Sequence, residues 1–87
     1  MPDVHADPDK LRQFASSLSR SAQQLESIAR QLQRGLDTTG WQDSERQRFE
    51  QDFLQTVRIL TQFTDRLRGQ YIPQLQKKAT ALDRFRE

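Results

Sequence analysis

The spacing of the apolar residues is the feature that most constrains how this chain can fold. In two segments, apolar side chains recur every three or four residues, and mostly polar side chains fill the positions between them. At about 100° per residue, this spacing gathers the apolar side chains along one side of an α-helix. The sequence therefore predicts two amphipathic helices and an all-α fold.

The first helix is predicted over residues 8–38, after an N-terminal segment, residues 1–6, that is expected to be flexible. Asp7 can cap this helix, Pro8 fits the first helical position, and Asp9 suits the positive end of the helix dipole. Gly35 lies inside the pattern, but Leu36 keeps the apolar phase, so the helix is expected to continue past it. Its apolar positions are Leu11, Phe14, Leu18, Ala22, Leu25, Ile28, Ala29, Leu32 and Leu36.

A second helix is predicted over residues 44–86, after a turn at 39–43. Asp43 or Ser44 can cap it, and Ser44 with Gln47 fits a capping box. Pro73 removes a hydrogen bond and crowds the carbonyl of Gly69, which predicts a kink near 69–73. Because the apolar spacing continues across that point, one kinked helix is expected. Its apolar positions are Phe49, Phe53, Val57, Leu60, Phe63, Leu67, Tyr71, Leu75, Ala79, Leu82 and Phe85.

The unequal lengths of the two helices predict an antiparallel hairpin with an overhang. Arms of about 30 and 43 residues are roughly 45 and 65 Å long. Folded back from the turn, Leu11 is expected to reach the level of Gly69, and each large apolar side chain left exposed beyond it forgoes about 1.5 to 3 kcal/mol. A second hairpin is therefore expected to cover the overhang and form a four-helix bundle. The side chains concerned are Tyr71, Leu75, Leu82 and Phe85.

The composition supports this expectation of association. Only 33% of the 87 residues are hydrophobic, against roughly 45 to 50% in ordinary globular domains. There is no Cys for a disulfide or thiolate metal site, and no apolar run long enough for a transmembrane helix or a secretory signal peptide. The net charge of +2 comes from interleaved acids and bases. The chain is expected in the cytoplasm, or outside it by a route that needs no signal peptide.

The titratable residues do not predict an enzyme. His5 has Asp3 and Asp7 nearby, but one His with mobile carboxylates gives no fixed metal geometry, so a solvated tail is the preferred interpretation. A two-helix hairpin also offers no cleft in which a carboxylate pKa would be raised. No catalytic residue, cofactor, metal or small-molecule substrate is expected. The carboxylates that flank the turn without a converging His, Cys or Lys are Glu45, Glu50 and Asp52.

The basic C-terminal third supports an alternative function. Arg66, Lys77 and Arg84 are expected to align opposite the apolar stripe, where they could bind nucleic acid or an anionic membrane. A solvated outer face is preferred, because no aromatic side chains interleave with them for base stacking. A purely structural coiled-coil subunit is a further alternative.

Trp41, the only tryptophan, lies in the predicted turn. Its ring can seal the end of a helical hairpin, or it can serve as a binding hot spot. The residues alone leave both interpretations open.

A small Cys-free helical hairpin with Trp in its turn resembles the WXG family, the early secretory antigen-like proteins of type VII secretion. The resemblance covers residues 7–86 and rests on Trp41-Gln42-Asp43, with Phe49 following at helical distance. Asp43 stands where the family has Gly, and both residues suit an N-cap. The family's C-terminal export signal, Tyr followed four residues later by an acid, is absent, since Leu75 follows Tyr71 at that distance.

The resemblance implies a dimer, either of this chain or with a related hairpin, in a four-helix bundle. It also implies that the Trp41 turn of one chain lies near the C-terminal end of its partner's long helix. The implied function is that of a substrate, co-substrate or adaptor of a type VII-like secretion system, with Trp41, Gln42, Asp43 and Phe49 in partner recognition. The expected hairpin or dimer seam comprises Leu11, Phe14, Leu18, Leu25, Ile28, Leu32, Leu36, Phe53, Val57, Leu60, Phe63, Leu67, Tyr71, Leu75, Leu82 and Phe85.

Overall fold

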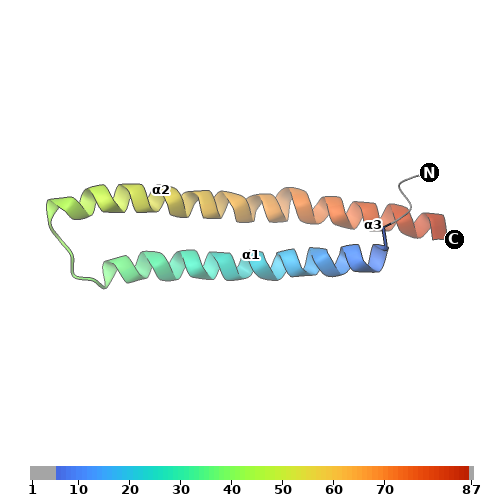
Figure 1. Ribbon diagram of the computed structural model, residues 1–87, viewed down its shortest axis with the longest axis horizontal. Helices are drawn as coiled ribbons and strands as arrows, with labels where there is room; N and C mark the ends of the chain where they lie inside the picture. Colours follow the sequence, from blue (N-terminus) through green and yellow to red (C-terminus); the bar gives the residue numbers. More distant parts are fainter. Residues whose placement is uncertain (1–5, 87) are drawn as a thin grey trace.

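The computed structural model describes residues 6–86, which form an all-α hairpin shaped as a rod of 65 × 18 × 16 Å (Figure 1). One arm is α1 (Pro8–Asp37). The other is a continuous helical path made of α2 (Ser44–Arg66), a π-helical turn (Leu67–Tyr71) and α3 (Ile72–Arg86). A loop at 38–43 joins the arms, and α1 begins at the end of the rod where α3 ends.

The ends of α1 follow from local side-chain chemistry. The carboxylate of Asp7 accepts a hydrogen bond of 2.9 Å from the backbone N–H of Asp9, which caps the first turn. At the other end, the hydroxyl of Thr39 donates to the carbonyl of Leu36 at 2.8 Å. Gly40 then adopts a φ of +73°, a left-handed conformation that suits glycine, and turns the chain into the loop.

Small residues at every seventh position of α1 form its buried line. Since side chains seven residues apart lie on one stripe of a helix, these residues all face the other arm. The three alanines leave room for the two backbones to approach closely. Leu11, Leu18 and Leu25 flank this line and are half-buried. The buried residues are Pro8, Ala15, Ala22, Ala29 and Leu36.

The π turn compensates for one extra residue in the long arm. Its apolar stripe advances by seven residues on either side of the turn but by eight across it, from Thr64 to Ile72 and from Leu67 to Leu75. The backbone N–H of Ile72 bonds to the carbonyl of Leu67, a step of five residues that takes up the additional one. The stripe therefore keeps facing α1 on both sides of the π turn.

The predicted kink near 69–73 takes the form of this π turn at Leu67–Tyr71. Pro73 is the second residue after it, at a place where its ring would crowd the carbonyl of Gly69 in a regular α-helix. Both the extra residue and the proline favour a widened turn here.

The register of the two arms differs from the prediction. Leu11 was expected opposite Gly69, yet its neighbour Arg12 hydrogen-bonds Asp83, about 14 residues or roughly 20 Å further along the arm. Figure 1 shows the reason: α2 begins beyond the end of α1, because the loop runs partly along the rod. The long arm therefore extends beyond α1 at both ends of the rod.

The predicted lack of cover is consequently wrong for three of the four C-terminal apolar residues. Leu82 is buried, and Tyr71 and Leu75 are half-buried within this single chain. α1 packs more extensively against α3 than against α2. Of the four residues expected to lack a partner, Phe85 alone is exposed, at 72%.

Candidate interaction surface

The two broad sides of the hairpin differ in chemistry. One side carries ion pairs that connect the arms, Arg12 with Asp83 and Arg68 with Glu26. The hydrogen bond from Arg12 to Asp83 raises the pKa of the arginine, against a smaller opposing effect of desolvation. Polar side chains such as Ser16 line a hollow together with Arg12. These charged groups on this side therefore already have partners within one chain.

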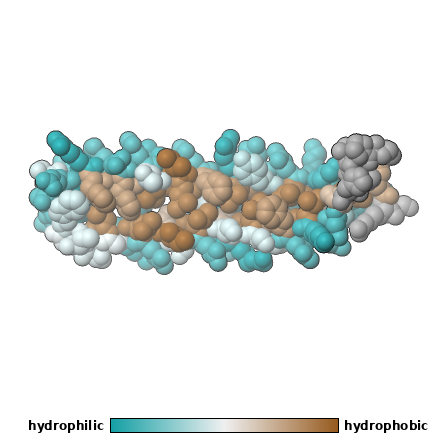
Figure 2. Space-filling model, viewed as in Figure 1, coloured by the Kyte–Doolittle hydropathy of each residue, from teal (hydrophilic) through white to brown (hydrophobic). Residues whose placement is uncertain are grey.

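The opposite side exposes large apolar side chains along the length of the rod. Figure 2 shows them as a continuous band between two polar rims. Seven large apolar residues of the described chain are 44 to 72% exposed. We call this surface the apolar face; it comprises Phe14, Ile28, Leu32, Phe49, Phe53, Ile59, Leu60, Phe63 and Phe85.

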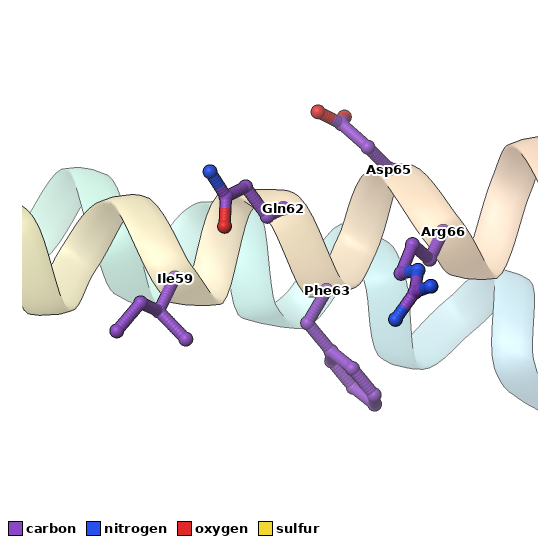
Figure 3. A pocket seen from close by; sticks show the side chains of 5 residues that line it. All are labelled: Ile59, Gln62, Phe63, Asp65 and Arg66. Atoms are coloured by element: carbon purple, nitrogen blue, oxygen red, sulfur yellow. The ribbon is translucent and has the colours of Figure 1, made fainter.

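An apolar groove lies in the half of this face nearer the loop. Leu32 of α1 and Phe53, Leu60 and Phe63 of α2 line it, and it contains almost no polar surface. In the adjoining hollow, Ile59 and Phe63 project to one side of α2 while Asp65 points away from them (Figure 3). The groove is therefore continuous with side chains that have no cover within the chain.

At the loop end, Asp43 organises both α2 and Trp41. Its Oδ1 accepts hydrogen bonds from the backbone N–H groups of Glu45 at 3.0 Å and Arg46 at 3.2 Å, which caps α2. The same oxygen accepts the indole Nε1–H of Trp41 at 2.7 Å. The structure thus brings together Trp41 and Asp43 of the predicted turn motif.

Three aromatic rings extend the apolar face to this end. The centroid of Trp41 lies 5.4 Å from that of Phe49 in a tilted arrangement, and Phe49 stacks on Phe53 at 5.4 Å. Trp41 remains partly exposed, and these rings line an open hollow with Leu36. Gln42, also predicted for this site, is exposed in the loop.

Arg46 is a residue that the sequence analysis missed. Its guanidinium donates to the carbonyl of Trp41 at 2.7 Å and to the carboxylate of Asp37 at 3.0 Å, and it lies 3.6 Å from Glu50. Its side chain is only 19% exposed. Arg46, which lies on α2, thereby connects the loop to that helix and to the end of α1. The available signal was its place three residues after Asp43 and four before Glu50, within reach of both.

The predicted seam residues divide by burial. The ones that face the other arm are Leu36, Val57, Leu67 and Leu82, all buried. A second group lies at the edge of the contact and is half-buried, namely Leu11, Leu18, Leu25, Phe53, Leu60, Tyr71 and Leu75. The exposed remainder is Phe14, Ile28, Leu32, Phe63 and Phe85. Thr64, buried and bonded to the carbonyl of Thr61 at 2.8 Å, was missed.

Of the three basic residues predicted to align, Arg66 lies away from the expected face. Arg66 lines the hollow with Ile59 and Phe63, beside the apolar face rather than opposite it (Figure 3). Lys77 and Arg84 are exposed on α3. The π turn between these residues changes the angular relationship on which the predicted alignment depended.

The sequence analysis preferred a solvated tail to a metal site around His5. Asp3 and His5 lie outside the described residues. Within residues 6–86, no three His, Cys, Asp or Glu side chains are grouped so as to hold a metal ion. No helix in that part of the chain is both long and apolar enough to cross a membrane.

Comparison with known proteins gave no further identification. No family model, no curated protein and no solved structure matches this chain.

Proposed function

We propose that this chain is a non-enzymatic helical-hairpin subunit that associates with a second helical hairpin through its apolar face to form a four-helix bundle. The observation that supports this proposal is the contrast between the two broad sides. One side joins the arms by ion pairs, whereas the other leaves seven large apolar side chains 44 to 72% exposed. Exposed apolar surface of this extent is typical of an interaction site.

Burial of this face is the favourable contribution to association. Removing apolar surface from water stabilises a complex by roughly 25 cal/mol per Å², before the cost of immobilising the partners. Two facing hairpins would give each long arm a second neighbour, as in a four-helix bundle. The partner in this proposal is a copy of this chain or a related small hairpin.

The wider role that we propose is that of a WXG-like substrate, co-substrate or adaptor of a type VII-like secretion system. Its basis is the sequence resemblance, in which Trp41 lies between two amphipathic helices. The partly exposed indole ring and the open hollow beside it are compatible with a third protein binding at the loop end. Loss of that binding in Trp41→Ala, with association through the apolar face retained, would support this role.

The association is tested with Phe63→Glu, which places a charge in the centre of the apolar face. Because burial of an unpaired carboxylate is strongly unfavourable, the dissociation constant measured by analytical ultracentrifugation should rise at least about tenfold. Gln51→Glu introduces the same side chain on an exposed position of the same helix, about 120° around the helix axis from Phe63, and should leave association unchanged. Equal association of both variants would contradict the proposal.

The two alternative functions predict different results under the same conditions. A basic module would shift a labelled duplex or sediment with anionic liposomes, and either effect would weaken steeply with salt. A purely structural coiled-coil subunit would form oligomers larger than two hairpins. The position of Arg66 beside Ile59 and Phe63 does not favour the first alternative, which depends on Arg66 aligning with Lys77 and Arg84.

A further inference from the structure

We propose that the apolar groove binds one molecule of a long-chain fatty acid, with its carboxylate on Arg66 and its tail directed toward Trp41. The proposal goes beyond association with a second hairpin, because it assigns a small-molecule ligand to a single chain. It is based on three adjoining hollows of the apolar face and on the charges at their edge.

The three hollows share lining side chains and so form one continuous apolar track. The groove itself has a volume of about 450 Å³, within the range of roughly 300 to 1,000 Å³ that is typical of small-molecule sites. It shares Phe63 with the hollow that contains Arg66. Toward the loop, it shares Phe53 with the hollow that contains Trp41. One end of the track is therefore cationic and the other aromatic.

Arg66 is available to bind an anion at the edge of the groove. Its side chain is exposed, and no ion pair within residues 6–86 involves it. It projects to the same side of α2 as Ile59 and Phe63, whereas the neighbouring Asp65 points away (Figure 3). A guanidinium in this position can hold a carboxylate by two parallel hydrogen bonds while the attached apolar chain enters the groove.

The charges along this edge favour a single carboxylate over an extended anionic surface. Glu45, Asp52, Ile59 and Arg66 follow one another at steps of seven residues and therefore lie on one stripe of α2. An anionic membrane lying along the rod would meet the two acids at the loop end of this stripe, and like charges repel. A fatty acid has one charge, which it can place on Arg66 while only its methylene groups extend toward the acids.

The length of the track indicates the length of the ligand. Arg66 follows Phe53 by 13 residues, which is about 20 Å along a helix. An extended chain advances about 1.2 Å per bond, so about 16 to 18 carbons would span this distance. The methyl end would then reach Phe53, whose ring stacks on Phe49, and the centroid of Phe49 lies 5.4 Å from that of Trp41.

Palmitate is the probe for this site, used below the concentration at which it forms micelles. Isothermal titration calorimetry should show one molecule bound per chain. Laurate, which is four carbons shorter, should have a dissociation constant at least about tenfold higher, because it removes less apolar surface from water. Equal affinity for laurate and palmitate, or several molecules bound per chain, would contradict a groove that holds one chain of this length.

Arg66→Glu tests the position of the carboxylate. At low salt, it should raise the dissociation constant of palmitate about tenfold. It should lower that of hexadecyltrimethylammonium, which has the same tail and the opposite charge. Arg84→Glu makes the same charge change on an exposed position of α3, roughly 25 Å further along the arm, and should leave both constants within about twofold. Equal effects of the two variants would show that Arg66 does not hold the carboxylate.

Trp41, the only tryptophan, reports the direction of the tail. Palmitate brominated near its methyl end should quench the Trp41 emission, because bromine quenches an indole at close range. Palmitate brominated near its carboxylate should leave the emission nearly unchanged. The reverse order would overturn the orientation proposed for the ligand.

The outcomes separate this proposal from the proposed function. Because the groove lies within the apolar face, bound palmitate should raise the dissociation constant of association between hairpins; binding that leaves association unchanged would place the ligand elsewhere. Palmitate binding by a chain that never associates would contradict the proposed function alone. Association that responds to Phe63→Glu, in a chain that binds no palmitate or that binds only anionic vesicles, would overturn the ligand site alone.

Discussion

The indole N–H of Trp41 and the carboxylate of Asp43 form a hydrogen bond of 2.7 Å inside the loop that joins the two arms. The same carboxylate oxygen caps α2 by accepting two backbone N–H groups. One side chain therefore fixes both the first turn of α2 and the direction of the Trp41 ring. A glycine at this position could permit the cap geometry but could not orient the indole.

Substitutions of Asp43 should separate its capping of α2 from its orientation of the Trp41 ring. Asp43→Ala loses the N-cap, so the free energy of unfolding should fall by about 0.5 to 2 kcal/mol in urea denaturation. Asp43→Gly should cost only a few tenths of a kcal/mol of capping, but it still frees the indole, so tryptophan emission should shift to longer wavelength. Asp43→Asn retains an acceptor and serves as the control. An unchanged emission spectrum in Asp43→Gly would contradict the role given to this hydrogen bond.

Arg46→Lys should destabilise the loop although it preserves the charge. A lysine cannot reach the carbonyl of Trp41 and the carboxylate of Asp37 with two separate donors in a fixed plane, as the guanidinium does. We expect a loss of about 0.5 to 1.5 kcal/mol in the free energy of unfolding. Arg48→Lys, on an exposed position of the same helix, should change it by less than about 0.5 kcal/mol. Equal effects of the two substitutions would argue against a special role for Arg46.

Ala22→Leu tests the close approach of the arms. Ala22 is fully buried on the line of small residues in α1, and a larger side chain there would force the arms apart. Overpacking of this kind typically costs about 1 to 3 kcal/mol, measurable as a lower melting temperature. Ala81→Leu makes the same change on an exposed position and should be nearly neutral. A neutral Ala22→Leu would mean that the arms are not held at the distance set by these alanines.

Deletion of Gln70 tests the origin of the π turn. Removing one residue restores a spacing of seven from Thr64 to Ile72, so a regular α-helix becomes compatible with the apolar stripe. The deletion is best made with Pro73→Ala, because proline strains the interior of a regular helix. This chain should remain folded, with helical circular dichroism and a melting temperature close to that of Pro73→Ala alone.

Deletion of Gln55 in the same background provides the comparison. No compensating irregularity lies nearby, so this deletion rotates the start of α2 by about 100° relative to the rest of the arm. Val57 and the residues after it would keep their contacts with α1, whereas Phe53 would turn away from the stripe. We expect a lower melting temperature than in the Gln70 deletion. The reverse order would mean that the π turn does not arise from the spacing.

Much of the fold could be predicted from the sequence because it depends on local patterns. The apolar spacing indicated the all-α class, which the structure confirms, and Asp7 caps α1 as the sequence suggested. The relative position of the arms could not be derived in this way. It depends on the path of the six loop residues, which sets where α2 begins relative to the end of α1. It also depends on long-range contacts such as that of Arg12 with Asp83.

The candidate site was only partly accessible to sequence reasoning for the same reason. Trp41 stood out as a single large ring at a break in the pattern, and Asp43 as a helix cap. Arg46 did not, because its importance comes from three contacts that exist only once the loop has folded. The apolar periodicity also did not separate Leu82, which the other arm buries, from Phe63, which remains exposed.

Because α2 begins beyond the end of α1, the rod consists of two helices along most of its length but of a single helix at the loop end. The first turns of α2 have the loop as their main neighbour, so their amides should exchange with solvent at a lower free energy than those near Val57. We therefore expect this end to open more readily than the rest of the hairpin. A surface of that kind can adjust its shape to a binding partner without unfolding the rod that supports it.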